Sequence, residues 1–443
     1  MKADAEHIFW LSDVGKDDVG CAGGKGANLG ELTKAGVAVP PGFIVSADAY
    51  FSFIDSANLR PAIYRLTTDL DYNDSSRLQE VAGVLKAAIC SAPVPPELVR
   101  QIHGDYQRLG SGPVAVRSSA TAEDIAEASF AGQQSTFLNV EGAENVVVAV
   151  RDCWASLYEA RALFYRHEAG FDHLGVGIAV VVQRMIQSQR AGVMFTVEPV
   201  AGDLSRICIE AIYGLGEALV GGHVTPDTYV VDKVNLKILE KKVEPQERQL
   251  VRNRGAHGPE DEANAWAKVP ARQRRQQKLS DDDITALAKQ GRQIETHYSF
   301  PQDIEWAQED GRFYVLQARP VTTAVEKVEA REEAAWETAR LILTGSAASP
   351  GVEAGTVRIV LSPDQLDKVQ PGDVLVAEMT PPDYVPAMKR AAAIVTDRGG
   401  RTAHAAIVSR ELGIPCIVGA EKATTTLKDG QVITVDGAKG KVY

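Results

Sequence analysis

Short apolar runs alternate with polar and glycine-containing turns along most of the chain. Apolar runs of about four to eight residues between turn residues are typical of buried strands. This pattern predicts strands at 43–45, 114–120, 179–185, 191–196 and 207–211. Helical periodicity fills intervals between them, and residues 149–167 predict one amphipathic helix with a buried aromatic face. Such alternation is typical of α/β and α+β domains.

Two further strand-like runs, 303–307 and 313–319, flank an Asp-Gly step that is typical of a β-hairpin turn. Upstream of them, Ser280 and Asp283 have the spacing of a helix N-cap. The segment 245–280 is rich in Glu, Gln, Arg and Gly. We interpret it as a solvated or mobile excursion and not as a nucleic-acid surface, because the chain as a whole is acidic.

The C-terminal part of the sequence differs in composition and in the length of its apolar runs. Residues 324–340 are charged and alanine-rich, which predicts a helical linker between domains. After them, strands of four to six residues punctuated by glycines predict a small β/α domain. We therefore expect a large domain at 1–323, a linker at 324–342 and a small domain at 343–443.

The small domain contains a histidine in a distinctive setting. An apolar run at 391–395 is followed by Gly399 and Gly400, which permit a sharp turn, and a helix is predicted from His404 until Gly413. Free backbone N–H groups and the helix dipole stabilise a phosphoryl group at such a helix start. A neutral imidazole there can attack phosphorus as a nucleophile. The alternative is an ordinary histidine at the start of a helix.

A glycine-rich stretch at 20–30 carries a single lysine, Lys25, and precedes a short predicted helix. Backbone amides and one ammonium group together suit a phosphate ligand. The stretch is not a P-loop, because Lys25 is followed by Gly26 where that motif has Ser or Thr. A flexible glycine turn is the alternative interpretation.

Two polar residues stand at the ends of predicted strands. Arg117 lies beside Ser118 and Ser119, ahead of a small-residue loop at 128–134. A guanidinium binds phosphate oxygens in pairs, so Arg117 is a candidate triphosphate contact, with a structural salt bridge as the alternative. Gln183 is the polar side chain near the end of a buried strand, and we take it as a candidate contact on the adenine side.

The predicted hairpin carries four polar positions. With a period of two, Asp303 and Glu305 share one face of the first strand, and Gln317 and Arg319 share one face of the second. Burying such groups is costly unless they serve ligands or one another. Glu305 and Gln317 offer oxygen atoms suited to Mg²⁺, and Arg319 can neutralise phosphate. The alternative is a Glu–Arg pair across a solvated sheet face.

Composition narrows the class of protein. The 443 residues are 45% hydrophobic and 24% charged, with a net charge of −12, so any phosphate site must be local. Five scattered cysteines without a CxxC pair predict free thiols. With no secretory signal and no apolar run of membrane-spanning length, we expect a cytoplasmic protein that binds neither nucleic acid nor membrane.

Several motifs, in order along the chain, resemble one enzyme family. The segments GGKGANLGEL, PPGF, AVRSSATAED, SFAGQQ, DIEWA and QARP, between residues 23 and 320, resemble the ATP-grasp nucleotide-binding domain of phosphoenolpyruvate synthase. The segment 372–419, which contains TDRGGRTAHAAIVSRELGIPCIVG, resembles the swivelling phosphohistidine domain of that enzyme and of pyruvate phosphate dikinase. The resemblance covers nearly the whole chain.

The resemblance implies an activity and a role for each candidate residue. ATP would give AMP, with the β-phosphoryl passing to His404 and then to pyruvate to form phosphoenolpyruvate. Lys25, Arg117 and Arg319 would bind the phosphates of ATP. Glu305 and Gln317 would hold Mg²⁺. Such chemistry needs positioning and charge neutralisation more than covalent help from the protein.

The sequence departs from the family pattern in two places. Ala403 stands where phosphoenolpyruvate synthases commonly have Cys, and the sequence stops at Tyr443 where the family enzymes continue into a pyruvate-binding β/α barrel. We therefore expect the acceptor site on a separate subunit or on another segment. The alternatives are a phosphotransferase to a phenol or drug hydroxyl, working with a partner subunit, and a nucleotide-binding fragment without turnover. Thr402 matches the family's regulatory phosphorylation position, with a turn residue as the alternative.

Overall fold

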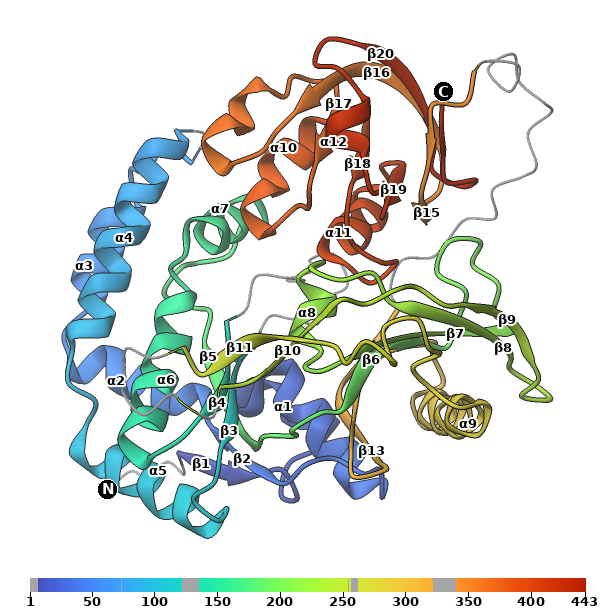
Figure 1. Cartoon of the computed structure of the whole chain (residues 1–443). Coiled ribbons are helices and arrows are strands. Elements are labelled where there is room, and N and C mark those ends of the chain that lie inside the picture. The colour runs from blue at the N-terminus through green and yellow to red at the C-terminus, as the bar shows by residue number, and fades with distance from the viewer. Residues whose placement is uncertain (1–6, 73, 122–134, 254, 256–261, 322–339) are drawn as a thin grey trace. The chain divides into compact units, whose positions relative to one another are not determined.

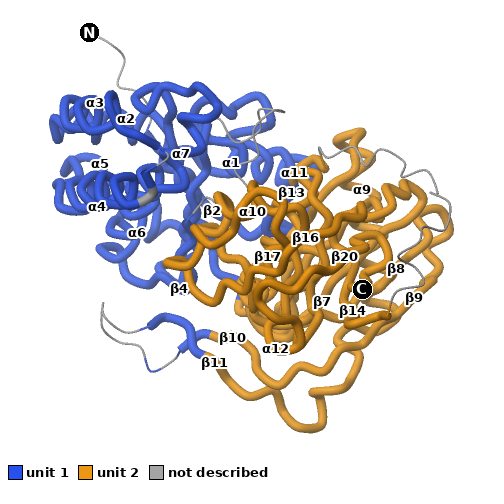
Figure 2. The backbone as a smooth tube through the Cα atoms, turned by 90° about the horizontal axis from the view of Figure 1, so that it is seen from above, with its two compact units in different colours: residues 1–186, 252–265, 314–318 blue, residues 187–251, 266–313, 319–443 orange. Residues whose placement is uncertain are grey.

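The computed structural model describes residues 7–72, 74–121, 135–253, 255, 262–321 and 340–443. Helices and mixed sheets alternate along it, as expected of a multidomain α/β protein (Figure 1). The chain divides into two compact units, drawn in different colours in Figure 2. The first comprises 1–186, 252–265 and 314–318, and the second comprises 187–251, 266–313 and 319–443. The small-residue loop at 128–134 and nearly all of the predicted linker helix lie outside the described residues.

The first unit is built on a five-stranded antiparallel sheet in the order β1-β2-β5-β3-β4. Its strands are β1 (Ile8–Trp10), β2 (Gly42–Val45), β3 (Val114–Ala120), β4 (Thr136–Val140) and β5 (Ile178–Arg184). Its helices are η1 (Lys16–Asp18), α1 (Val19–Lys34), α2 (Ala47–Ser56), α3 (Arg60–Thr67), α4 (Ser75–Ser91), α5 (Pro96–Arg108), α6 (Ala143–Ser156) and α7 (Ala160–Glu168). The predicted strands at 43–45, 114–120 and 179–185 are thus confirmed.

Both faces of this sheet are covered, because its strands alternate between two apolar clusters. Phe43, Val180 and Val182 point into a large core with α2 to α7, whereas Ile44 and Val181 pack with α1 on the opposite face. Since side chains alternate along a strand, every second residue of β3 and β5 lies on the α1 face. The polar candidates of these two strands share that face.

The predicted helix at 149–167 is wrong in one respect, because the structure has two helices there, α6 and α7. Between them, Leu157, Tyr158 and Glu159 donate backbone hydrogen bonds to the third residue before each, which tightens and ends the helix. Tyr158 is fully buried, and its hydroxyl lies 2.8 Å from the Tyr50 hydroxyl. This long-range contact lies at the point where the chain turns and where local periodicity predicted a continuous helix.

The predicted glycine loop is also only partly right. The stretch lies inside α1, which breaks at Gly23, where φ is +67° and ψ is 168°. A helical segment therefore resumes directly after Gly23, so that Lys25 lies in a first helical turn and not in an open loop. The glycines serve helix packing: a Cβ on Gly26 would lie 2.9 Å from the Ile44 side chain.

The second unit contains most of a six-stranded sheet in the order β13-β12-β6-β7-β8-β9. Its strands are β6 (Arg190–Phe195), β7 (Arg206–Tyr213), β8 (Asp227–Asp232), β9 (Ile238–Lys242), β12 (Gln302–Glu309) and β13 (Arg312–Pro320). The smaller elements nearby are α8 (Glu217–Val220), β10 (Arg248–Arg252), β11 (Asn264–Lys268) and α9 (Asp281–Tyr298). The predicted hairpin is β12–β13, and α9 begins with the predicted Ser280–Asp283 capping box.

An eight-stranded mixed sheet completes the second unit, in the order β14-β21-β20-β16-β17-β18-β19-β15. The pairs from β16 through β19 are parallel and the other pairs are antiparallel. Its strands are β14 (Leu343–Thr344), β15 (Ser346–Ser349), β16 (Val352–Ile359), β17 (Val374–Ala377), β18 (Ala393–Thr396), β19 (Cys416–Val418), β20 (Val432–Asp436) and β21 (Lys441–Val442). Its helices are η3 (Pro363–Lys368), η4 (Pro382–Tyr384), α10 (Val385–Arg390), α11 (His404–Leu412) and α12 (Ala423–Thr426). Two apolar clusters, one including α10 and α11 and the other including α12, flank the parallel strands.

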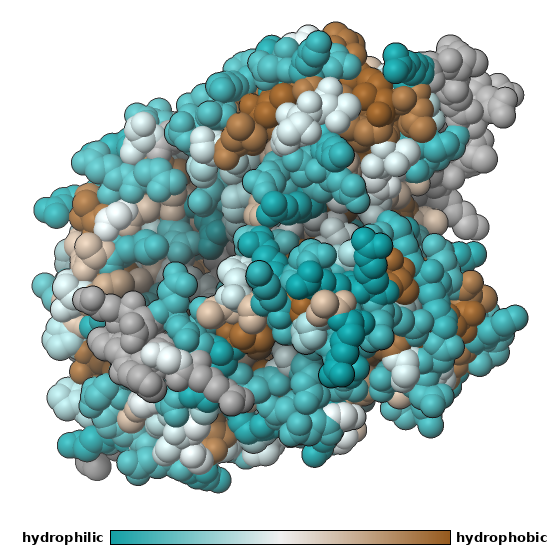
Figure 3. Space-filling model, in the orientation of Figure 1, coloured by the Kyte–Doolittle hydropathy of each residue, from teal (hydrophilic) through white to brown (hydrophobic). Residues whose placement is uncertain are grey.

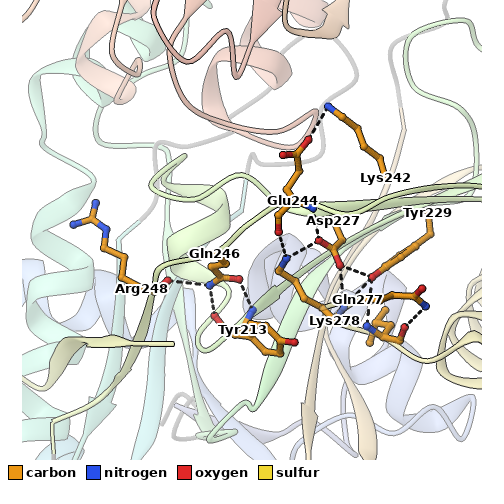
Figure 4. A network of polar contacts seen from close by, with 10 residues as sticks. Tyr213, Asp227, Tyr229, Lys242, Glu244, Gln246, Arg248, Gln277 and Lys278 are labelled. Atoms are coloured by element: carbon orange, nitrogen blue, oxygen red, sulfur yellow. Dashed lines mark hydrogen bonds and ion pairs between the residues drawn. The ribbon is translucent and has the colours of Figure 1, made fainter. Parts of the chain in front are cut away.

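The expectation of a solvated excursion at 245–280 is wrong at its two ends. Lys278 and Asp227 form an ion pair with both side chains 0% exposed, and the Lys278 ammonium also donates to the Glu244 carbonyl oxygen at 2.8 Å (Figure 4). Gln246 is 2% exposed and bonds both backbone groups of Tyr213. The carboxylate and the carbonyl offset the desolvation of the ammonium, so the excursion is anchored in the core.

Charged and polar residues dominate the molecular face shown in Figure 3, while apolar residues gather mainly over the C-terminal elements at the top of that view. The most exposed large apolar side chains include Val432 and Leu361. Within the described residues, none of the helices combines the length and the hydropathy needed to cross a lipid bilayer.

Candidate active site

The α1 face of the first sheet brings several predicted site residues together. Arg117 and Gln183 both lie on that face, on the paired strands β3 and β5. Arg117 is 8% exposed, and its guanidinium donates to the Leu316 carbonyl oxygen at 2.7 Å and to Gln317 Oε1 at 3.0 Å. A predicted phosphate contact and a predicted metal ligand, 200 residues apart in sequence, are therefore direct neighbours.

Gln183 is held more tightly than the sequence indicated. It is 2% exposed, and its amide nitrogen donates to the Pro40 carbonyl oxygen at 3.0 Å. Pro40 lies two residues before the start of β2, so this bond ties the segment that leads into β2 to β5. The contact orients Gln183, and its role toward a nucleotide stays a prediction.

The broken helix α1 is fastened to the same sheet face by Ser119. The Ser119 hydroxyl accepts a hydrogen bond from the Gly26 amide at 3.1 Å and donates one to the Ala22 carbonyl oxygen at 3.0 Å. A Cβ on Gly23 would lie 2.2 Å from the Ser119 carbonyl oxygen, so the backbones touch as only glycine allows. Half-buried Lys25 is thereby held at a helix start against β3, where amide dipoles favour an anion.

In the second unit, Arg319 is paired with Asp303 and not with Glu305. Arg319 Nε and Nη2 lie 3.0 Å and 2.9 Å from Asp303 Oδ2. Burial alone would lower the pKa of Arg319, but the Asp303 carboxylate outweighs it, and the pKa is raised overall. The guanidinium is thus fixed as a cation. The alternative expectation of a solvated Glu–Arg pair is therefore wrong, because the partner of Arg319 is Asp303, which is 8% exposed.

Only two protein ligands, Glu305 and Gln317, are predicted for Mg²⁺. Among the residues that the structure describes, no group of three or more His, Cys, Asp or Glu side chains is placed to hold a metal. Glu305 and Gln317 are nevertheless hard oxygen donors, and Mg²⁺ is commonly held by one or two protein ligands together with water and substrate phosphates. Gln317 Oε1 accepts from Arg117 and has a second lone pair available. Each side chain is thus a chemically suitable ligand for Mg²⁺, and the pair as one metal site stays a prediction.

His404 is the first residue of α11, as predicted, with Ala403 in the extended N-cap position. Gly399 precedes it with φ of +111°, and Gly413 ends the helix in the left-handed conformation at φ of +66°. The imidazole is half-buried. The predicted strand–glycine turn–helix arrangement is thus confirmed from β18 to the end of α11.

Two carboxylates that the sequence interpretation missed hold the turn before His404. Glu210 in β7 accepts hydrogen bonds from the Arg401 amide at 2.8 Å and from the Thr402 hydroxyl, and the Arg401 guanidinium pairs with Glu198 at 2.7 Å. Thr402 is 1% exposed, so here it is a turn residue with a buried partner. One signal was available: Glu210 is a lone carboxylate in the apolar run 207–212, which is costly without a partner.

The buried setting of Glu210 changes its acidity. Burial raises the pKa of the Glu210 carboxyl, while the hydrogen bonds from Thr402 and from the Arg401 amide lower it; burial prevails, and the pKa is raised. Hydrogen bonds to a carboxylate that is shielded from water are stronger than those to a neutral oxygen atom.

The sequence matches the models of a known class of enzymes. Residues 19–339 match the family model described as "Pyruvate phosphate dikinase, AMP/ATP-binding domain", and residues 369–440 match that of the "PEP-utilising enzyme, mobile domain". The chain therefore belongs to the phosphoenolpyruvate synthase and pyruvate phosphate dikinase family.

Individual relatives agree with this assignment. The chain is 52% identical over 99% of its length to the probable phosphoenolpyruvate synthase of Methanothermobacter thermautotrophicus, covering 63% of that protein. It is 46% identical over 98% of its length to the phosphoenolpyruvate synthase of Pyrococcus furiosus, and 48% identical over 98% to a probable one of Archaeoglobus fulgidus, covering 58% of each. The chain thus spans about three fifths of these curated relatives.

Proposed function

We propose that this chain carries the ATP-dependent half of a phosphoenolpyruvate synthase reaction, with His404 as the residue that is phosphorylated. The observation that carries the proposal is the position of His404 at the start of α11, directly after a glycine turn, in a chain of this family. The overall reaction would convert ATP, pyruvate and water into AMP, phosphoenolpyruvate and inorganic phosphate.

In the proposed first step, a nitrogen of the neutral His404 imidazole attacks the β-phosphorus of ATP. The bond from that phosphorus to the oxygen that bridges to the α-phosphate breaks, and AMP leaves with the electron pair. Water then removes the γ-phosphoryl as inorganic phosphate, which leaves the β-phosphoryl on His404. The backbone amides and the dipole at the start of α11 would stabilise the charge of that group.

The remaining candidates would bind ATP. Lys25, Arg117 and Arg319 would neutralise its phosphates, and Gln183 would lie on the adenine side. Mg²⁺ held by Glu305 and Gln317 would neutralise charge on the phosphate oxygens. The distance of 3.0 Å between the Arg117 guanidinium and Gln317 Oε1 supports a role for Arg117 in binding phosphate close to the proposed metal.

The proposal includes the domain organisation. An ATP-grasp domain at 1–323 would be joined by a linker at 324–342 to a swivelling phosphohistidine domain at 343–443. Pyruvate is the acceptor that the named relatives suggest. We place the reaction in a reducing, cytoplasmic compartment, since all five cysteines are free.

The test uses ATP labelled at the β-phosphate. With Mg²⁺, the wild-type chain is expected to take up label that is stable in alkali and lost in acid, as a phosphohistidine is. The variant His404→Asn should take up none, whereas His297→Asn, a matched change at an exposed histidine of α9, should label normally. Absence of label in the wild type, or persistence of label in His404→Asn, would falsify the proposal.

The acceptor is tested by a chase. Purified labelled protein is mixed with pyruvate, and separately with a phenol, and the small-molecule products are separated. Loss of label to phosphoenolpyruvate supports pyruvate as the acceptor. Transfer to the phenol alone would instead favour a phosphotransferase for another acceptor.

A further inference from the structure

The turn before His404 makes a close fit with the segment 198–226 of the same unit. Glu210, in the middle of β7, receives two hydrogen bonds from this turn: one from the Arg401 amide and one from the Thr402 hydroxyl. Glu210 is 3% exposed and Thr402 is 1% exposed, so water is excluded from the contact. Hydrogen bonds to a charged acceptor in such a setting are stronger than neutral ones.

A second carboxylate reinforces the first. The Arg401 guanidinium lies 2.7 Å from Glu198 Oε1, and Glu198 is 8% exposed. The other oxygen of Glu198 accepts from the backbone amides of Val200 and Ala201. The backbone amides of its own turn therefore hold Glu198 Oε2, and this fixes Oε1 in position to accept from Arg401.

The backbone of the turn before His404 also lies close to the segment 198–226. A Cβ on Gly400 would lie 2.8 Å from the Pro226 ring and 3.0 Å from Glu210 Oε1. A Cβ on Gly222 would have Gly399 and Ala403 within ordinary contact distance, at 3.8 Å each. The turn 399–403 thus lies against the segment 198–226 along its whole length, as a built contact and not as a single ion pair.

We propose that Glu210, assisted by Glu198, is a positioning residue for phosphoryl transfer to His404, through a carboxylate clasp on Arg401 and Thr402. The clasp fixes the turn that aims the first residue of α11, while neither carboxylate touches the reacting atoms. The inference rests on the proposed function of His404. Release of His404 toward an acceptor would require the clasp to open, which makes Glu210 a control point for both half-reactions.

Single-turnover labelling from β-labelled ATP tests the positioning role in the full chain. Glu210→Ala and Thr402→Val should each slow labelling of His404 by about ten- to hundredfold, the effect of losing a charge-assisted hydrogen bond. Thr402→Ser keeps the hydroxyl and should restore the wild-type rate. The ATP concentration for half-maximal rate should not change, because the clasp acts on the histidine side.

A double-variant cycle distinguishes loss of the Glu210–Thr402 contact from independent effects of the two substitutions on the fold. If Glu210 and Thr402 act through one contact, Glu210→Ala with Thr402→Val should label no more slowly than the worse single variant. Fully multiplicative effects would overturn the proposal. Glu378→Gln is the matched control, since Glu378 pairs with Arg398 beside the turn, 2.8 Å away, outside the clasp. It should label at the wild-type rate.

Hydrogen exchange supplies a readout that does not depend on activity. The Arg401 amide donates to Glu210, so in the full chain it should exchange at least tenfold faster in Glu210→Ala, and in Thr402→Val, than in wild type or Glu378→Gln. If the Arg401 amide exchanges at the wild-type rate in both variants, the clasp is contradicted even where labelling is slow. If instead the wild type never takes up label but exchange behaves as expected, the phosphohistidine proposal fails and the clasp stands as a structural contact.

Discussion

At the scale of single residues, Gly23 shows how a small group positions a functional one. Its φ of +67° breaks α1, and the break lets the Gly26 amide reach the Ser119 hydroxyl. Lys25 is carried on the helical turn that results. The glycine is therefore required by backbone geometry and by the close approach to β3, and not by flexibility.

This argument predicts that Gly23→Ala is destabilising. The new methyl group would combine an unfavourable φ with a 2.2 Å clash against the Ser119 carbonyl oxygen, so the unfolding free energy should fall by about 3 kcal/mol or more. Gly36 is the matched control: its φ is +76°, but open space surrounds it, so Gly36→Ala should cost only about 1 kcal/mol. Urea denaturation followed by fluorescence measures both. Equal losses would contradict the packing argument.

At the scale of elements, the buried ion pair of Asp227 and Lys278 fastens the long excursion after β9 to the core of the second unit. Asp227 accepts from the Tyr229 hydroxyl at 2.7 Å as well as from Lys278, and the backbone amides of Glu244 and Lys278 also donate to it (Figure 4). Every oxygen of this buried carboxylate is thus satisfied. Such networks specify one arrangement of the chain more than they add net stability.

The network predicts unequal effects of single and double variants. Lys278→Met leaves the Asp227 charge buried without its partner and should lower the unfolding free energy by about 3–5 kcal/mol. Asp227→Asn combined with Lys278→Met removes both charges and should be less damaging than Lys278→Met alone. Thermal and urea unfolding of the three proteins measure this. A double variant that is less stable than Lys278→Met would show that the charges themselves stabilise the fold.

At the scale of the whole molecule, each of the two units brings together candidate residues that are distant in the sequence. Arg117 and Gln317 come from strands separated by 200 residues, and Glu210 and Thr402 by 192. A ligand that contacts several such parts adds its binding free energy to the stability of the assembled state.

ATP with Mg²⁺ should therefore raise the midpoint of thermal unfolding. At a hundredfold excess over its dissociation constant, a ligand contributes about 2.7 kcal/mol. Chelation by EDTA should reduce the shift, because the metal that neutralises the phosphates is lost. Lys25→Met should also reduce it, whereas Lys34→Met, an exposed lysine at the other end of α1, should not. An equal shift in both lysine variants would argue against the role of Lys25.

Local sequence patterns were enough to predict much of the secondary structure. Apolar runs predicted β3, β5 and β7, Ser280 and Asp283 marked the start of α9, and Gly399 to Gly413 marked the turn, the start and the end of the His404 helix. These features depend on residues within a few positions of one another, through hydrogen-bonding caps, allowed backbone angles and side-chain alternation. Candidate site residues followed from motifs in the same local way.

The contacts between distant groups, in contrast, became known from the three-dimensional fold. Arg319 pairs with Asp303, although strand periodicity placed Glu305 equally well. The buried Lys278 pairs with Asp227, and Tyr158, just after the end of α6, contacts Tyr50. The clasp of Glu210 on Thr402 belongs here too. Burial and partner choice depend on strand order and on packing between distant segments, and no local pattern encodes them.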